Sequence, residues 1–209
     1  MSDADPVVCA GCGRAYEAAR FAGGRTFVCA CGARVGRRME RRLDHPPRFA
    51  ADSMLGGLAR HLRALGYDTT WESPIEDPEV VRRAVAESRI LLTRDVGIGE
   101  EWWIEGLVML ASDDPLEQLR EVAARFGLDD AAAFTRCTRC NAPLEPVTAE
   151  DAGNAVPPAV REANLPLARC PACGRVYWEG SHTRGMRETL GRALSRWTDG
   201  GPDEGRRTP

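Results

Sequence analysis

Residues 90–95 read Ile90-Leu91-Leu92-Thr93-Arg94-Asp95, an apolar run that ends in a charged pair. A short, continuous apolar run of this kind is typical of a strand that is buried on both faces, as in a parallel sheet. Residues 48–52 follow the same pattern and also end in an aspartate, Asp52. We therefore predict two buried strands, each of which ends at a carboxylate.

Helical patterns alternate with strands on both sides of these two runs. Residues 67–71 and 107–111 are predicted to be further strands, and a helix is predicted from Pro115 to a stop at Gly127. Asp77 is a candidate N-cap for a helix that has Pro78 in its first turn. Another helix, stopped by Gly66, carries its apolar residues on one face, namely Leu55, Leu58, Ala59, Leu62 and Leu65. This alternation predicts an α/β fold with a parallel sheet and right-handed crossovers.

The predicted strands place carboxylates at one edge of that sheet, beyond the carboxyl ends where α/β proteins bind ligands. The candidate catalytic residues are Asp52, Asp95, Asp113, Asp114 and Asp77. Clustered carboxylates repel one another unless a cation lies among them, and hard oxygen ligands select Mg²⁺ or Mn²⁺. Such ions support phosphodiester hydrolysis. The alternative is that these residues cap helices, which applies above all to Asp114, just before Pro115.

Eight cysteines form two quartets with the spacing of metal ligands. The quartets are Cys9, Cys12, Cys29 and Cys31, and Cys137, Cys140, Cys170 and Cys173. We predict one structural Zn²⁺ in each, with the glycine or asparagine after each pair adopting a positive φ. The N-terminal quartet is the weaker match because its second pair is Cys-x-Cys. A disulfide, a redox pair and an iron–sulfur cluster are the alternatives. Because the spacers and flanks of the two quartets differ, we do not predict a repeat.

Composition excludes several classes of protein. The 209 residues include no lysine, so there is no P-loop. No apolar stretch is long enough for a membrane span and no secretory signal is visible, so we expect a cytoplasmic protein. Charge is uneven: net +4 over residues 1–50, −9 over residues 51–135 and +2 over residues 136–209. An acidic centre between basic ends is consistent with metal-binding carboxylates beside arginines that bind a polyanion.

Several blocks resemble a known family, in the order in which that family has them. They are residues 49–68 with Asp52-Ser-Met-Leu-Gly-Gly-Leu-Ala-Arg60, residues 89–95, Asp113-Asp114-Pro-Leu-Glu117, and the segments 136–141 and 170–182 around the second quartet. The chain is similar over about residues 47–190 to the PIN-like ribonuclease domain named after the C-terminal region of the Mut-seven exonuclease, with its C-terminal zinc ribbon. The N-terminal quartet lies outside this region.

The resemblance implies a PIN-like fold and an Mg²⁺- or Mn²⁺-dependent ribonuclease. It places Asp52, Asp95 and Asp113 or Asp114 in the acidic cluster, with Asp77 as a further member. It places the Thr93 hydroxyl beside them. It also offers Arg60, Arg63 and Arg94 as phosphate contacts, although ion pairs within the domain would explain these arginines equally well.

The predicted division of the chain is an N-terminal zinc ribbon (1–36), a basic linker (37–47), the PIN-like nuclease domain (48–130), a C-terminal zinc ribbon with a terminal helix at 185–197 (134–197), and a disordered tail (198–209). If residues 33–48 form a helix, their arginines line one stripe that suits either a phosphate backbone or solvent. These are Arg34, Arg37, Arg38, Arg41 and Arg42. His61 is expected on a helix surface, and His182 is expected to pack on a knuckle or to touch RNA.

Together these features predict a metal-dependent ribonuclease whose zinc ribbons help to hold RNA. The alternative is a non-catalytic RNA- or ribosome-binding module. In a third possibility the ribbons bind a protein partner.

Overall fold

A computed structural model describes residues 5–195. The predicted disordered tail at 198–209 lies outside the described residues. The described chain forms two compact units, one from residues 5–56 and 70–111, the other from residues 57–69 and 112–195. No helix in these residues is long and apolar enough to span a membrane. The predicted domain boundaries stay a prediction.

The first unit contains a four-stranded sheet with the strand order β6-β5-β7-β8. Its strands are β5 (Phe49–Ala51), β6 (Thr69–Trp71), β7 (Ile90–Thr93) and β8 (Leu107–Met109). Ala50 pairs with Leu91, and Leu92 pairs with Val108, both in parallel register. All residues of β5 and β7 are buried because they are apolar or, like Thr93, internally hydrogen-bonded. The predicted α/β fold with a parallel sheet is confirmed.

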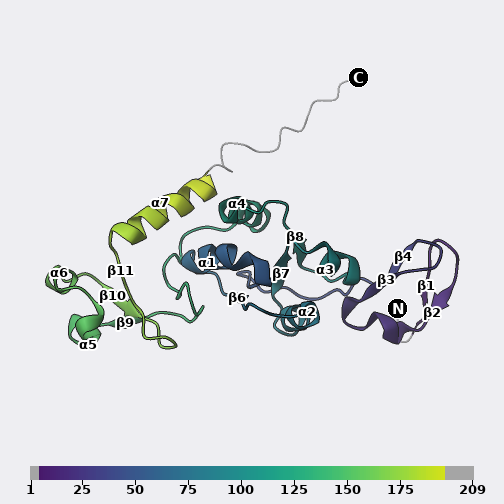
Figure 1. The fold of residues 1–209 in the computed structure, drawn as a ribbon, viewed down its shortest axis with the longest axis horizontal. Coiled ribbons are helices and arrows are strands. Elements are labelled where there is room, and N and C mark those ends of the chain that lie inside the picture. Colours follow the sequence, from purple (N-terminus) through teal and green to yellow (C-terminus); the bar gives the residue numbers. More distant parts are fainter. Residues whose placement is uncertain (1–4, 196–209) are drawn as a thin grey trace, which may run out of the picture. The chain divides into compact units, whose positions relative to one another are not determined.

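Two helices of the first unit lie beside this sheet. Helix α2 (Asp77–Ala86) packs against β5 and β7 (Figure 1) and buries Val80, Val81 and Ala84. The prediction that Asp77 is the N-cap was wrong by one residue, since Glu76 occupies that position and Asp77 is the first residue of the helix. Helix α3 (Val96–Glu101) was not predicted, because a six-residue segment with two glycines carries no helical signal.

The N-terminal quartet lies between two small hairpins in the same unit. These are β1 (Val7–Val8) with β2 (Ala15–Tyr16), and β3 (Thr26–Val28) with β4 (Arg34–Gly36). A 3₁₀ segment, η1 (Ala18–Gly24), joins them. Phe21 stacks on Phe27 at 5.5 Å, and Tyr16 meets Phe27 edge-on at 4.8 Å. These rings and the buried cysteines form a small core of their own.

Residues 33–48 do not form the helix on which the basic stripe depended. Residues 34–36 are a strand, and the segment that follows has no helix and pairs through Met39 with Ile104. Arg34 donates to the carbonyl of Gly99 at 2.7 Å, and Arg41 donates to the carbonyls of Glu105 at 2.8 Å and Ala84 at 3.0 Å. These carbonyls belong to α3, to the last turn of α2 and to the loop after α3. Arg34 and Arg41 therefore form hydrogen bonds with distant parts of the chain and are not part of a basic stripe along one helix.

The second unit contains three longer helices. They are α1 (Gly56–Ala64), α4 (Pro115–Phe126) and α7 (Ser181–Ser195). Helices α4 and α7 lie side by side (Figure 1), and α7 begins four residues before the predicted start at 185. Gly66 ends the segment after α1 at φ +92, where a Cβ would lie 2.1 Å from the carbonyl oxygen of Ala132. Only glycine fits this stop.

The C-terminal quartet belongs to a three-stranded antiparallel sheet in the second unit. Its strands are β9 (Glu145–Val147), β10 (Leu167–Arg169) and β11 (Val176–Trp178), with β10 in the middle. The insertion between β9 and β10 forms α5 (Ala149–Ala152), η3 (Gly153–Ala155) and α6 (Pro158–Glu162). Ala152, Val156, Leu167 and Val176 form the buried core of this ribbon.

Candidate functional site

A chain of hydrogen bonds joins Asp52 to Asp95 through Thr93. Asp52 directly follows β5 and is 2% exposed, whereas Thr93 ends β7 and is fully buried. The Thr93 hydroxyl donates to Oδ2 of Asp52 at 2.7 Å and accepts from the backbone N–H of Asp95 at 2.9 Å. Because β5 and β7 are parallel neighbours, the carboxylates that follow them meet at one sheet edge. Thr93 therefore orients the Asp52 carboxylate and holds the backbone of Asp95.

Backbone N–H groups hold one oxygen of each of these carboxylates. Oδ1 of Asp52 accepts from the Ser53 N–H at 2.5 Å, and Oδ1 of Asp95 accepts from the Gly97 N–H at 2.7 Å. Asp95 is thus the N-cap of α3. Capping and metal binding are compatible, since a carboxylate has about four lone-pair positions.

Asp77 shares the electrostatic environment of these two acids. Burial raises the pKa of Asp77 above its ordinary value, and the negative charges of Asp95 and Asp52 raise it further. Glu76 and Glu101 add smaller contributions. Because Glu76 is the N-cap residue, the Asp77 carboxylate is not used as a helix cap. Glu101 was missed from the sequence because α3, which carries it, has no helical signal.

The carboxylates are the right chemical type for Mg²⁺ or Mn²⁺ but are less closely gathered than the cysteines. In residues 5–195, the sets of three or more metal-ligating side chains whose ligand atoms all lie within 4.8 Å are the two cysteine quartets. The acids fit a divalent cation by charge and donor type, and the charges of Asp95 and Asp52 act on Asp77.

Asp113 and Asp114 lie in the loop that precedes α4, and both are exposed. Oδ1 of Asp114 accepts from the backbone N–H groups of Leu116 and Glu117, each at 2.9 Å. This is the helix-capping alternative that the position before Pro115 left open. A metal-binding role for either residue stays a prediction.

The three candidate phosphate-binding arginines have different surroundings. Arg63 is 4% exposed and donates to the carbonyls of Thr69 at 2.8 Å, Arg139 at 2.8 Å and Thr138 at 3.3 Å. Its guanidinium therefore joins α1 to the Cys137–Cys140 knuckle, which favours a structural role. Arg60 is exposed on α1, and Arg94 is half-buried beside Asp95.

His61 is not the surface residue that its helix position predicted. It is half-buried, and its Nδ1 atom has no hydrogen-bond partner in the described structure. It lines a cavity of about 400 Å³ with His182 and Ser181 from the first turn of α7. Burial lowers the pKa of His61.

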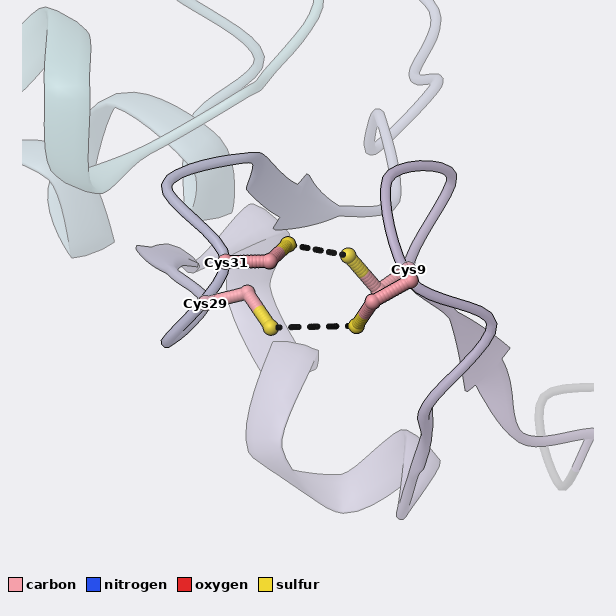
Figure 2. Close-up of side chains that lie close together, drawn as sticks. Cys9, Cys29 and Cys31 are labelled. Atoms are coloured by element: carbon pink, nitrogen blue, oxygen red, sulfur yellow. Dashed lines mark hydrogen bonds between the residues drawn. The ribbon is translucent and has the colours of Figure 1, made fainter.

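The sulfur atoms of the N-terminal quartet point into one shared space. Figure 2 shows Cys9, Cys29 and Cys31 facing one another from two loops. Sγ of Cys9 lies 3.5 Å from that of Cys31, and Sγ of Cys12 lies 3.7 Å from that of Cys29. A tetrahedral Zn²⁺ with Zn–S bonds of about 2.3 Å separates its sulfurs by about 3.8 Å, whereas a disulfide needs about 2.05 Å. The quartet therefore fits zinc.

The short Cys-x-Cys pair closes with a tighter turn than the other knuckles. The Gly32 N–H donates to the Cys29 carbonyl, whereas in the Cys9 knuckle the Gly13 N–H donates to the Cys9 carbonyl one residue further back. All four residues that follow the pairs have the predicted positive φ. They are Gly13, Gly32, Asn141 and Gly174.

The C-terminal quartet has the same geometry. Sγ of Cys137 lies 3.8 Å from that of Cys173, and Cys137 and Cys170 are completely buried. Burial raises the pKa of the Cys137 thiol, but the Tyr177 hydroxyl and the N–H groups of Cys140 and Arg139 lower it to about 6. A thiol that ionises this readily suits a metal ligand.

One pattern shared by the two ribbons was missed. Cys12-Gly-Arg-Ala-Tyr16 and Cys173-Gly-Arg-Val-Tyr177 have the same Cys-Gly-Arg-x-Tyr form. The Tyr16 hydroxyl lies 2.9 Å from Sγ of Cys29, and the Tyr177 hydroxyl lies 3.1 Å from Sγ of Cys137. Each tyrosine thus bonds a cysteine of the opposite knuckle. The knuckle and the strand after it do repeat, although the spacers differ.

The fold and these sites define a mixed α/β protein with a parallel sheet and two four-cysteine centres that fit zinc. The chain belongs to the Mut7-C RNAse domain family, whose model matches residues 47–190. The family resemblance noted in the sequence is thereby confirmed, and it suggests a nuclease or RNA-related role. No curated protein and no solved structure matches the chain. The match begins after the N-terminal quartet, which is an addition to the family domain.

Proposed function

We propose that the protein is a metal-dependent ribonuclease that hydrolyses RNA phosphodiesters at Asp52, Asp95 and Asp77. The observation that carries this proposal is the hydrogen-bond chain from Asp52 through Thr93 to Asp95, in a chain that belongs to an RNase domain family. The charges of Asp52 and Asp95 both act on Asp77, which supports its membership in the same cluster.

In this proposal the aspartates bind the metal ion, Thr93 orients one of them, and arginines bind the RNA. Asp52 and Asp95 would hold Mg²⁺ or Mn²⁺, with Asp77, and with Asp113 or Asp114 as further candidates. The ion, when bound, supplies an activated water and neutralises charge on the phosphodiester oxygens. Thr93 holds the Asp52 carboxylate in one orientation, so no reorganisation is required when the substrate arrives. Arg94, half-buried beside Asp95, and Arg60, exposed on α1, are the candidates for binding RNA phosphates.

The zinc ribbons would stabilise the fold and aid RNA binding. Four thiolates saturate a tetrahedral zinc, so neither quartet has an open position for catalysis. In the C-terminal ribbon, Arg63 and the Asn141–Asp68 hydrogen bond of 2.7 Å hold the first knuckle to the segment after α1.

The test compares RNA cleavage by the wild type and by an Asp95→Asn variant, with Mn²⁺ and with Mg²⁺. An asparagine keeps the oxygen that accepts from Gly97 but loses the charge, so we expect the fold to persist and cleavage to fall at least about 100-fold. Asp129→Asn is the matched control, because Oδ1 of Asp129 accepts from the Ala131 N–H at 3.0 Å in the same way. Cleavage that continues unchanged in Asp95→Asn would refute the assignment.

The second candidate is a non-catalytic RNA- or ribosome-binding module. It is favoured by the capping contacts of Asp95 and Asp114 and by the wider spacing of the acids compared with the cysteines. Tight RNA binding by the wild type, with no cleavage under either metal, would support this candidate over the ribonuclease.

A further inference from the structure

Trp71 forms a hydrogen bond with Ser53, the residue that follows Asp52. It is the last residue of β6, the strand next to β5. Its indole N–H donates to the carbonyl of Ser53 at 3.0 Å, and the Ser53 N–H donates in turn to Oδ1 of Asp52 at 2.5 Å. One residue therefore separates the aromatic ring from the carboxylate of the proposed site.

The ring lies against the backbone at the start of α1. A Cβ on Gly56 would lie 2.7 Å from Cζ2 and 2.9 Å from Cε2 of Trp71, closer than such atoms approach. Gly56 has φ −59, which any residue adopts, so its backbone conformation does not require glycine. The absence of a side chain makes room for the indole instead.

This arrangement leaves part of the indole exposed and fixed in orientation. Trp71 is 38% exposed although its only polar group is already bonded to Ser53, so the exposed part is purely aromatic. Apolar side chains also stand in solvent beside each acid: Met54, two residues after Asp52, is 54% exposed, and Val96, next to Asp95, is 63% exposed. Single exposed apolar residues are common. An exposed aromatic ring that is fixed in orientation next to a cluster of carboxylates can, however, serve as a surface for binding a ligand.

We infer that Trp71 is a stacking surface for an unpaired nucleobase of the RNA strand whose phosphodiester lies at Asp52 and Asp95. The inference rests on the proposed function and specifies its substrate as single-stranded RNA. Bases in a duplex are already stacked on their neighbours, whereas an unpaired base can be splayed onto an aromatic side chain. A ring held in place loses little freedom on binding, which favours stacking on it.

The experiment measures the affinity of fluorescently labelled single-stranded RNA by anisotropy, without added Mg²⁺ or Mn²⁺. Trp71→Ala is expected to weaken binding by about 10-fold or more, and Trp71→Phe by less, because base stacking on an aromatic residue contributes that much. The affinity for the same sequence as a duplex is expected to stay unchanged. Trp103→Ala is the matched control, since Trp103 is 48% exposed but lies before β8, at its amino end.

Gly56→Ala tests the position of the ring without removing it. The added methyl group must displace the indole, so this variant is expected to weaken single-stranded binding although Trp71 is intact. Circular dichroism and thermal melts establish that each variant is folded. Unchanged affinity in Trp71→Ala, or an equal loss in Trp103→Ala, would overturn the inference, the latter by favouring a general effect of exposed tryptophans.

The cleavage assay separates this inference from the proposed function. Binding that depends on Trp71 without any cleavage supports the stacking surface and refutes the hydrolysis. Cleavage of the same strand with a kcat/KM unaffected by Trp71→Ala supports the hydrolysis and refutes the stacking surface. If the wild type binds no RNA, the inference is refuted, and a protein partner becomes the better occupant of this surface.

Discussion

The Thr93 hydroxyl donates a 2.7 Å hydrogen bond to Oδ2 of Asp52, and both side chains are almost completely buried. The buried Oδ2 atom of Asp52 loses its donor when this hydroxyl is removed, while Oδ1 keeps the Ser53 N–H, and an unsatisfied buried acceptor costs about 1–3 kcal/mol. Thr93→Val is therefore expected to lower the free energy of unfolding by at least this amount, measured with urea. RNA cleavage is expected to fall about 10-fold or more, because the carboxylate is no longer oriented.

Thr93→Ser is the control, because serine keeps the hydroxyl and with it the bonds to Asp52 and to the N–H of Asp95. It should behave much more like the wild type than Thr93→Val does. Equal losses in the two variants would mean that the methyl group, not the hydroxyl, matters here.

Asp114 caps α4, and two substitutions separate this function from metal binding. Asp114→Asn retains the accepting oxygen but not the charge, whereas Asp114→Ala removes both. If Asp114 only caps the helix, Asp114→Asn cleaves RNA as the wild type does and Asp114→Ala is destabilised by about 1 kcal/mol. If Asp114 also binds the metal, cleavage falls in both variants. Titration with Mn²⁺ then shows that both variants need a higher Mn²⁺ concentration than the wild type for half-maximal cleavage.

The tyrosines that bond the cysteines are expected to strengthen zinc binding. We expect about two zinc ions per chain by elemental analysis. Tyr16→Phe and Tyr177→Phe each remove a hydrogen bond to a sulfur and are expected to weaken zinc binding at their own quartet by about 10-fold. Competition with a chromophoric chelator measures this affinity.

Cysteine variants assign the effect to one site. Cys9→Ser is expected to leave one zinc ion, bound at the C-terminal quartet. In this background Tyr177→Phe is expected to weaken the affinity for that ion, and Tyr16→Phe is expected to leave it unchanged. Cys137→Ser reverses the pattern. A zinc content that stays at about two in either cysteine variant would contradict closed four-cysteine sites.

Arg63 and Arg60 are three residues apart on α1 and are expected to respond in opposite ways. Arg63→Met leaves three carbonyls without a charged donor, so we expect a loss of about 3 kcal/mol or more in unfolding free energy. The Arg60 side chain is exposed, so Arg60→Met should leave the free energy of unfolding unchanged. Its RNA affinity should fall, and the slope of log affinity against log salt concentration should decrease by about the amount of one phosphate contact. A stable Arg63→Met variant with reduced RNA affinity would instead assign the phosphate contact to Arg63.

His61 is expected to make the free energy of unfolding depend on pH near neutrality. Burial lowers its pKa in the folded state below the ordinary value of 6.5, and the charge of Arg60 lowers it further, while the Pro115 carbonyl and Asp114 oppose the shift. The unfolded chain therefore takes up a proton at His61 before the folded chain does. The unfolding free energy should fall as the pH is lowered from 8 through about 6, and His61→Gln should show a smaller fall. Equal pH dependence in the two proteins would show that other groups cause it.

The predicted strands around Asp52 and Asp95 were correct because a strand in the middle of a parallel sheet buries both of its faces, which a short apolar run provides. The helix after Pro115 was also correct, with Gly127 in the left-handed conformation at its end. The basic helix considered for residues 33–48 does not form. Its arginines Arg34 and Arg41 donate hydrogen bonds to carbonyls more than 40 residues away along the chain. No local pattern records such partners.

The candidate site divides in the same way. The order of the chain placed Asp52, Thr93 and Asp95 near one another, since parallel strands put their carboxyl ends at one edge. The role of Trp71 depends on a contact with Ser53 and on the space left at Gly56, neither of which has a sequence signal. The Cys-Gly-Arg-x-Tyr pattern, by contrast, was visible in the sequence and would have indicated both tyrosines.

The sequence by itself determined the α/β class, the positions of the buried strands and the two cysteine quartets, because apolar periodicity and ligand spacing are local properties of the chain. Only the tertiary structure decided that Thr93 joins Asp52 to Asp95 and that Arg63 supports a zinc knuckle. A polar side chain forms hydrogen bonds with whichever partner the fold brings within about 3 Å of it. The identity of that partner depends on residues distant in the sequence.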